Sequence, residues 1–217
     1  MLDDLIASFF DSTVAGEKII SSAPKLVLAS ASPRRRQLLA QAGLEFEVVE
    51  SGVDESRAEG EAGPDFALRM ACEKALAVSV RRPDALVLGA DTVVEIDGEI
   101  LGKPHDRADA RRMLQKLSGQ VHRVFTGFAL ARGGRIVESD AIVSGVRFRE
   151  LSAAEIEQYI ASNEPYDKAG GYAIQGDAGD FIAAVEGSIA NVMGLPIDEV
   201  LTALRRHGAG VEPSQAS

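Results

Sequence analysis

The sequence is poor in the residues that build covalent or histidine-based sites. It has one cysteine, Cys72, so no disulfide can form within a single chain. Sparing use of cysteine fits a reducing compartment, and we expect a cytoplasmic location. The three histidines, His105, His122 and His207, lack the spacing of metal ligands. We therefore expect no histidine-based metal site.

Long apolar runs and basic charge are also scarce. No uninterrupted apolar run is long enough to span a bilayer, and the N-terminus carries acids where a secretory signal has basic residues, so we expect no membrane partner. Asp and Glu outnumber Lys and Arg, 33 to 23, which gives a formal charge of −10. A surface that coats nucleic acid needs dispersed positive charge, so we expect no nucleic-acid partner. This balance still allows a small polyanion in a local basic pocket.

The length of 217 residues fits one domain, for which we expect residues 25–208. Residues 1–24 would form an N-terminal extension and residues 209–217 a disordered tail. Apolar periodicity and cap residues predict helices over 33–42, 64–80, 106–117, 152–162 and 196–204, and strands over 26–29, 46–49, 86–88, 121–131, 135–148 and 181–185. Strands that alternate with helices and also form long hairpins indicate an α/β fold, with a mixed, twisted sheet in two lobes around a central cleft.

One stretch, residues 25–43, combines a short apolar strand with a helix start rich in arginine. Ser32 suits the N-cap and Pro33 the first helical position. The first turn then carries Arg34, Arg35 and Arg36, whose charges oppose the helix dipole unless an anion binds between them. A phosphate site, with Ser30 and Ser32 in its turn, is the leading interpretation. The alternative is a solvated basic helix start with a good cap.

A second informative stretch, residues 85–99, places Asp91 and Thr92 between two apolar β segments. A carboxylate is costly to bury there, so Asp91 should bind a metal, pair with a cation or cap a turn. Asp97-Gly98 predicts a hairpin turn after Asp91, and Lys103, at the end of that hairpin, is a candidate phosphate contact. The stretch from Gly98 to Lys103 is not a nucleotide-binding P-loop, because its glycine spacing is one residue short and a proline replaces the required hydroxyl residue. Lys74, in the middle of a predicted helix, reads by itself as a surface lysine.

Taken together, the motifs resemble the Maf family of nucleoside triphosphate pyrophosphatases, also called septum formation inhibitors. The resemblance covers residues 26–207 in order. It rests on Ser30-Ala-Ser-Pro-Arg-Arg35, Gly89-Ala-Asp-Thr-Val-Val94, Gly102-Lys-Pro104, and Asp167-Lys-Ala-Gly-Gly-Tyr-Ala-Ile-Gln-Gly176 with Glu186-Gly-Ser188. Several independent motifs in one register are far more specific than any one of them alone.

The resemblance implies hydrolysis of a nucleoside triphosphate substrate between its α and β phosphates, with a divalent cation, Mg²⁺ or Mn²⁺, and a homodimeric assembly. It also implies an ITPase-like two-lobed fold. By position, Asp91 matches the catalytic aspartate, and Glu55, Lys74 and Lys103 match the other active-site charges. We expect Asp91 and Glu55 to hold the metal. The expected substrate-binding residues are Ser30, Ser32, Arg34, Arg35, Thr92, Lys168 and Gln175, of which Arg34, Thr92 and Gln175 match positions linked to base choice.

Two branches of this family differ in substrate. The Asp-Lys-Ala-Gly and Ile-Gln-Gly pattern is similar to the dTTP/UTP pyrophosphatases. Gly171 and Ile189-Ala190 depart from that pattern, where alanine and an aromatic residue are common. A 7-methyl-GTP pyrophosphatase is the alternative within the family, and a non-catalytic nucleotide-binding regulator of septum formation is the alternative outside enzymes.

Overall fold

The computed structural model describes residues 24–209, which form a mixed α/β fold around one seven-stranded sheet. The strand order is β2-β1-β3-β5-β6-β7, and β4 pairs with β3 outside this path. β1 pairs in parallel with β2 and β3, and all other pairs are antiparallel. Apart from Pro24 and Ala209, the expected N-terminal extension and C-terminal tail lie outside the described residues.

Most of the predicted helices and strands are confirmed within a few residues, but the strand predicted over 86–88 extends to Ile96. The strands are β1 (Leu26–Leu28), β2 (Glu47–Val48), β3 (Leu86–Ile96), β4 (Glu99–Leu101), β5 (Val121–Arg132), β6 (Arg135–Phe148) and β7 (Ile182–Glu186). The helices are α2 (Pro33–Gln41), α3 (Gly63–Arg81), α4 (Arg107–Leu117), α5 (Ala153–Ile160), α6 (Ile189–Val192) and α7 (Ile197–Arg206). Three short 3₁₀ turns, η1 (Glu164–Asp167), η2 (Ala169–Gly171) and η3 (Asp177–Phe181), form the polar segment before β7. No helix within residues 24–209 is both long and apolar enough to cross a membrane.

Local capping explains where several helices begin. The Ser32 hydroxyl accepts a hydrogen bond from the Arg35 N–H at the start of α2, and Pro33 occupies the first turn, as predicted. Ser152 and Glu155 form a reciprocal capping box at the start of α5. Each of these side chains satisfies a backbone N–H that the helix itself leaves without a partner. The turns that precede the helices are thereby fixed.

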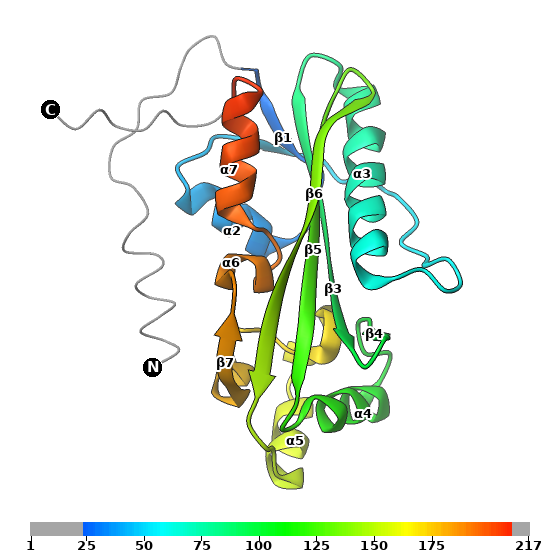
Figure 1. Ribbon diagram of the computed structural model, residues 1–217, viewed down its shortest axis with the longest axis vertical. Coiled ribbons are helices and arrows are strands. Elements are labelled where there is room, and N and C mark those ends of the chain that lie inside the picture. Colours follow the sequence, from blue (N-terminus) through cyan, green and yellow to red (C-terminus); the bar gives the residue numbers. More distant parts are fainter. Residues whose placement is uncertain (1–23, 210–217) are drawn as a thin grey trace, which may run out of the picture.

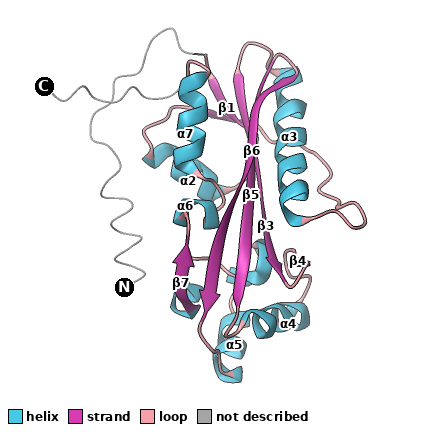
Figure 2. Cartoon of the chain, in the orientation of Figure 1, coloured by secondary structure: helices cyan, strands magenta, loops and turns pink. Residues whose placement is uncertain are grey.

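Helices cover both faces of the sheet (Figure 2), and α3 packs on one of them across the long strands β3, β5 and β6. Two glycines allow α3 to lie close to the strands. A Cβ atom at Gly127 would come within 2.4 Å of the Ala67 carbonyl oxygen, and one at Gly89 within 2.2 Å of the Ala71 carbonyl oxygen. The core on the other face runs continuously from β1 and α7 to α4 and α5. The long strands β3, β5 and β6 therefore connect the part of the molecule that holds β1 and α7 with the part that holds α4 and α5 (Figure 1).

The sheet has an opening along one edge of β3. β1 pairs with residues 86–88 of β3, and β4 pairs with residues 94–96 on the same side. In the described part of the chain, no strand pairs with residues 89–93 on that side. Asp91 and Thr92 lie in this gap, inside one continuous strand, so the prediction that they separate two β segments is wrong. Alternate residues of a strand point to opposite faces, and the gap lets both side chains reach the same space.

Candidate active site

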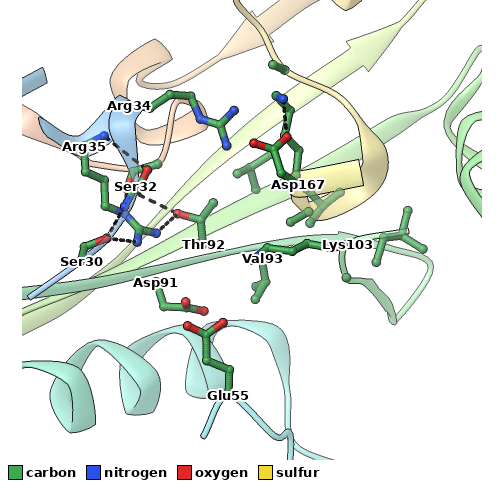
Figure 3. A pocket seen from close by; sticks show the side chains of 18 of the residues that line it. Ser30, Ser32, Arg34, Arg35, Glu55, Asp91, Thr92, Val93, Lys103 and Asp167 are labelled. Carbon is green, nitrogen blue, oxygen red and sulfur yellow. Dashed lines mark hydrogen bonds and ion pairs between the residues drawn. The ribbon is translucent and has the colours of Figure 1, made fainter. Parts of the chain in front are cut away.

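A cavity of about 1180 Å³ opens at this gap. Every residue proposed for the site from sequence, apart from Gln175, lines it: Ser30, Ser32, Arg34, Arg35, Glu55, Lys74, Asp91, Thr92, Lys103 and Lys168. Figure 3 shows most of these side chains converging from β1–α2, β3, the loop before α3 and the segment before η2. Residues that are far apart in sequence therefore share one concave site.

A lysine between two carboxylates forms the α3 side of the cavity. The Lys74 ammonium lies 2.6 Å from a carboxylate oxygen of Glu55 and 2.7 Å from one of Asp91. Lys74 is 5% exposed, so its interpretation as a surface residue is wrong. Partial burial pushes the pKa of Glu55 upward, but the Lys74 hydrogen bond and positive charge outweigh burial and leave that pKa below its ordinary value. Both carboxylates face the same position, as Figure 3 shows for Asp91 and Glu55.

A buried arginine forms the opposite side. Arg35 donates to the Gly194 carbonyl at 2.8 Å, to the Ser30 hydroxyl at 3.0 Å and to the Thr92 hydroxyl at 3.1 Å. All three acceptors are neutral oxygens. Burial lowers the pKa of Arg35, while the nearby negative charges of Asp91 and Glu55 act to raise it. Because no carboxylate of residues 24–209 forms a direct pair with Arg35, the guanidinium gives this wall of the cavity a positive charge.

The hydroxyls near Arg35 serve mainly to hold the wall in place. Ser30 also accepts from the Ser32 N–H at 3.2 Å, and Thr92 lies 2.9 Å from the Thr126 hydroxyl. Thr92 thus contacts the arginine and the neighbouring strand, and its predicted link to base choice stays a prediction. Of the three arginines in the first turn of α2, Arg34 and Arg35 line the cavity, whereas Arg36 is exposed.

The polar segment before η2 forms the roof opposite Asp91. The Lys168 ammonium donates to the Glu164 carbonyl at 2.6 Å and to the Asp167 carboxylate at 2.5 Å. Burial alone would raise the pKa of Asp167, but the contact with Lys168 and the charge of Arg34 hold it below its ordinary value. Lys103 is exposed at the rim of the cavity. Gln175 is half-buried and does not line the cavity, so its expected contact with substrate has no geometric support here.

Several residues of the cavity were not proposed from sequence. Asp167 faces Arg34 across the opening (Figure 3), Tyr172 lies deeper, and the carbonyl of Gly194 anchors Arg35. His105, Asp109 and Arg112 line the end near α4. Asp167 and Tyr172 stand in the glycine-rich segment that the sequence marked, but nothing in the sequence signals the carbonyl of a glycine.

Comparison with known proteins gives one family match and many relatives. A family model described as Maf-like protein matches residues 25–207. A dTTP/UTP pyrophosphatase of Syntrophus aciditrophicus is 49% identical over 188 residues, which cover 85% of this chain and 91% of that protein. Proteins with the same name from Geotalea uraniireducens and Anaeromyxobacter sp. are 51% and 53% identical, each over 85% of this chain and over 95% and 90% of their own lengths.

Solved structures give more distant matches. A HAM1 protein from Coxiella burnetii aligns with 58% of this chain and 73% of its own, at 15% identity and a TM-score of 0.40. A dITP/XTP pyrophosphatase from Mycobacterium abscessus aligns with 85% of this chain and 94% of its own, at 15% identity and a TM-score of 0.39.

Proposed function

Because the chain belongs to the Maf-like family, we propose that it hydrolyses dTTP and UTP between the α and β phosphates, releasing the nucleoside monophosphate and pyrophosphate. The relatives named dTTP/UTP pyrophosphatase support this substrate choice. The observation that carries the proposal is the convergence of Glu55, Lys74 and Asp91 with the Arg35 wall in one cavity. The proposal includes a homodimeric assembly and a cytoplasmic location, as the family resemblance implies.

The two carboxylates fit a divalent cation, Mg²⁺ or Mn²⁺. No group of three or more His, Cys, Asp and Glu side chains suited to a metal occurs within residues 24–209. Glu55 and Asp91, however, each contact the Lys74 ammonium through one carboxylate oxygen, so the second oxygen of each is a hard donor available to a cation beside Lys74. Mg²⁺ at nucleotide sites characteristically takes one or two carboxylates together with phosphate oxygens and water. Asp91 and Glu55 would hold the cation, which would supply positive charge to the phosphate oxygens.

The side chains of the cavity divide the remaining work. Phosphoryl transfer needs in-line positioning of a water and stabilisation of charge on the phosphate oxygens. Arg34, Arg35 and Lys103 supply positive charge on the phosphate-binding side. Asp91 orients the water and accepts its proton as the water oxygen attacks the α phosphorus. The bond from this phosphorus to the bridging oxygen then breaks, and its electron pair leaves with pyrophosphate.

Lys74 offsets the negative charges of Glu55 and Asp91. Without its ammonium, two negative charges would face each other in a partly buried site, which disfavours the charged form of both carboxylates. With Lys74 between them, Glu55 stays ionised at neutral pH, because its pKa lies below the ordinary value. Lys74 is therefore proposed to offset the negative charge of the two carboxylates and to keep Glu55 in its charged form.

A nucleotide panel tests the proposed function. The enzyme is assayed with Mg²⁺ for pyrophosphate release from dTTP, UTP, CTP and 7-methyl-GTP. We expect the highest kcat/KM for dTTP and UTP. A ranking led by 7-methyl-GTP would place the chain in the other branch of the family. Binding without pyrophosphate release from any of the four would instead favour the non-catalytic regulator.

A further inference from the structure

The loop that carries Glu55 has no helix or strand of its own. Residues 49–62 connect β2 to α3 and are mostly exposed, and Gly52 and Gly60 adopt positive φ angles of 68° and 74°. The Glu55 side chain is itself 54% exposed. A loop of this kind moves unless other elements hold it, and a metal ligand must be held within a fraction of an ångström. The position of Glu55 therefore depends on what anchors the loop.

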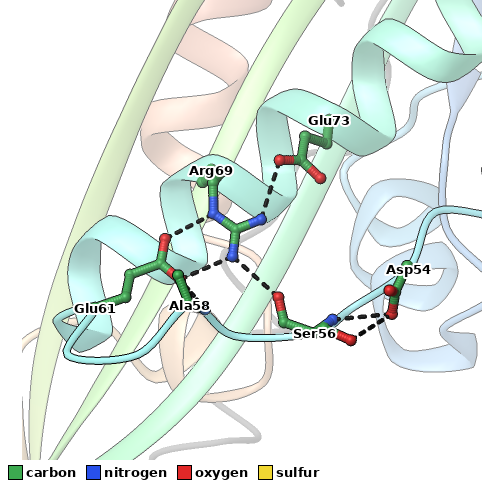
Figure 4. A network of polar contacts seen from close by, with 6 residues as sticks. All are labelled: Asp54, Ser56, Ala58, Glu61, Arg69 and Glu73. Atoms are coloured by element: carbon green, nitrogen blue, oxygen red, sulfur yellow. Dashed lines mark hydrogen bonds and ion pairs between the residues drawn. The ribbon is translucent and has the colours of Figure 1, made fainter.

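Arg69 of α3 is the centre of such an anchor (Figure 4). Its guanidinium makes two hydrogen bonds to the Glu61 carboxylate, at 2.6 and 2.7 Å, and one to Glu73 at 3.0 Å. It also donates to the main-chain carbonyl of Ser56 at 3.1 Å, directly after Glu55. The Glu61 carboxylate accepts in turn from the Ala58 N–H at 3.1 Å. One side chain thus ties both the middle and the end of the loop to α3.

The contacts on either side of Glu55 complete this anchor. Before it, Asp54 accepts from the Ser56 N–H at 3.1 Å and from the Ser56 hydroxyl at 2.7 Å, which closes a tight turn with Glu55 at its centre. At the start of the loop, Arg81 donates to the Glu50 carbonyl at 2.8 Å. The helix that supplies Lys74 to the Glu55 carboxylate therefore also binds the main chain around it.

We propose that Arg69 is a positioning residue that holds Glu55 opposite Asp91. Arg69 does not line the cavity, so it acts through the Ser56 carbonyl and the Glu61 carboxylate rather than on substrate. Bidentate pairing gives the anchor a defined geometry that a single point charge lacks. The Arg69 hydrogen bonds also lower the pKa of Glu61 to about 2, so the anchor persists throughout the neutral range. This inference rests on the proposed function of the cavity.

A double-mutant cycle separates positioning from general stability. The variants are Arg69→Ala, Arg69→Lys, Glu55→Gln and the double variant Arg69→Ala/Glu55→Gln, all in the full chain. In the parent background, we expect Arg69→Ala to lower kcat/KM for dTTP about tenfold and to raise the Mn²⁺ concentration needed for half-activation. In the Glu55→Gln background, we expect the same substitution to change kcat/KM less than about twofold. Arg69→Lys should restore part of the loss. The control Arg107→Ala, which breaks an exposed ion pair between Arg107 on α4 and Glu157 on α5, should leave kcat/KM unchanged.

A second readout does not depend on activity. Arg57 lies exposed in the loop and offers a trypsin site, so the rate of cleavage after Arg57 reports loop order. We expect faster cleavage in Arg69→Ala than in the parent or Arg107→Ala. Equal fractional losses of kcat/KM in both Glu55 backgrounds, or an unchanged cleavage rate, would overturn the positioning role. If the parent releases no pyrophosphate from any nucleotide of the panel, the proposed function fails, whereas the cleavage rate still decides whether Arg69 anchors the loop.

Discussion

Lys74 and Arg35 are both buried cations of the cavity, but their partners differ in charge. Lys74 pairs with two carboxylates, so its charge is more than offset locally. Within residues 24–209, the acceptors of Arg35 are the neutral oxygens of Ser30, Thr92 and Gly194. Burying a charge without an opposite partner is costly, and an incoming phosphate would relieve that cost. Lys74 therefore holds the two carboxylates in place, whereas Arg35 attracts an anion.

Another buried titratable residue, His122, gives a prediction about pH. Its imidazole lies 2.6 Å from the Tyr172 hydroxyl and is 1% exposed, and burial lowers its pKa to about 4. In the unfolded chain this pKa is about 6.5, so between these values the unfolded state binds more protons and stability falls as pH falls. As the pH falls from 7 to 5, His122 should therefore lower the free energy of unfolding by about 2 kcal/mol.

Replacing this histidine tests the sign and size of that effect. His122→Gln keeps a polar group but does not titrate, so the variant should lose less stability than the parent between pH 7 and pH 5. Urea unfolding at the two pH values measures the difference within each protein, which cancels any constant cost of the substitution. Equal losses in parent and variant would contradict a neutral, buried His122.

At the scale of elements, α3 is the helix on which the site depends. It supplies Lys74 to the carboxylates, and Arg69 and Arg81 to the loop that carries Glu55. It can do so only because it lies close to the sheet over Gly89 and Gly127. Gly89 is two residues before Asp91 on β3, so the two share a face of the strand. The close approach of α3 and the Lys74–Asp91 contact are therefore geometrically coupled.

This coupling predicts a large effect for Gly89→Ala. The new Cβ would meet the Ala71 carbonyl oxygen at 2.2 Å and the Ala75 nitrogen at 2.7 Å, so α3 must shift outward. We expect a loss of about 2–4 kcal/mol in the free energy of unfolding by urea, together with lower kcat/KM. Gly145→Ala on β6 is the matched control, because its Cβ would make only an ordinary contact at 3.6 Å. Similar stabilities of the two variants would refute the close packing.

The elements themselves could be predicted because their signals are local. Ser32 with Pro33, and Ser152 with Glu155, mark helix starts within a few residues, and Asp97-Gly98 marks the turn between β3 and β4. The continuity of β3 was missed for a physical reason. Polar residues inside a strand suggest a break, unless it is known that the strand has an open edge at that point.

At the scale of the whole molecule, the site depends on pairing that no short stretch of sequence encodes. The gap beside β3 exists because β1 ends and β4 begins on the same side of that strand. Sequence motifs predicted most of the site residues that surround this gap. They did not show that Lys74 is buried, nor that Gln175 stays outside the cavity, because burial follows from how α3 and the segment before β7 pack.

The distribution of charge completes this picture. The chain carries a formal charge of −10, yet α2 and the loop after β4 bring Arg34, Arg35 and Lys103 to one side of the cavity. A triphosphate therefore meets local positive charge on a molecule that is acidic as a whole. Such focusing favours the binding of a small polyanion.

The most direct test of this account is pyrophosphate release from dTTP by Asp91→Asn. This substitution keeps the shape of the side chain but removes the charge that faces Lys74 and the proposed metal. Release should fall by about a hundredfold or more, the scale for losing a base or metal ligand, while Asp84→Asn on the exposed loop before β3 changes little. A folded Asp91→Asn protein that retains activity within a factor of a few of the parent would contradict the assignment of this cavity as the catalytic centre.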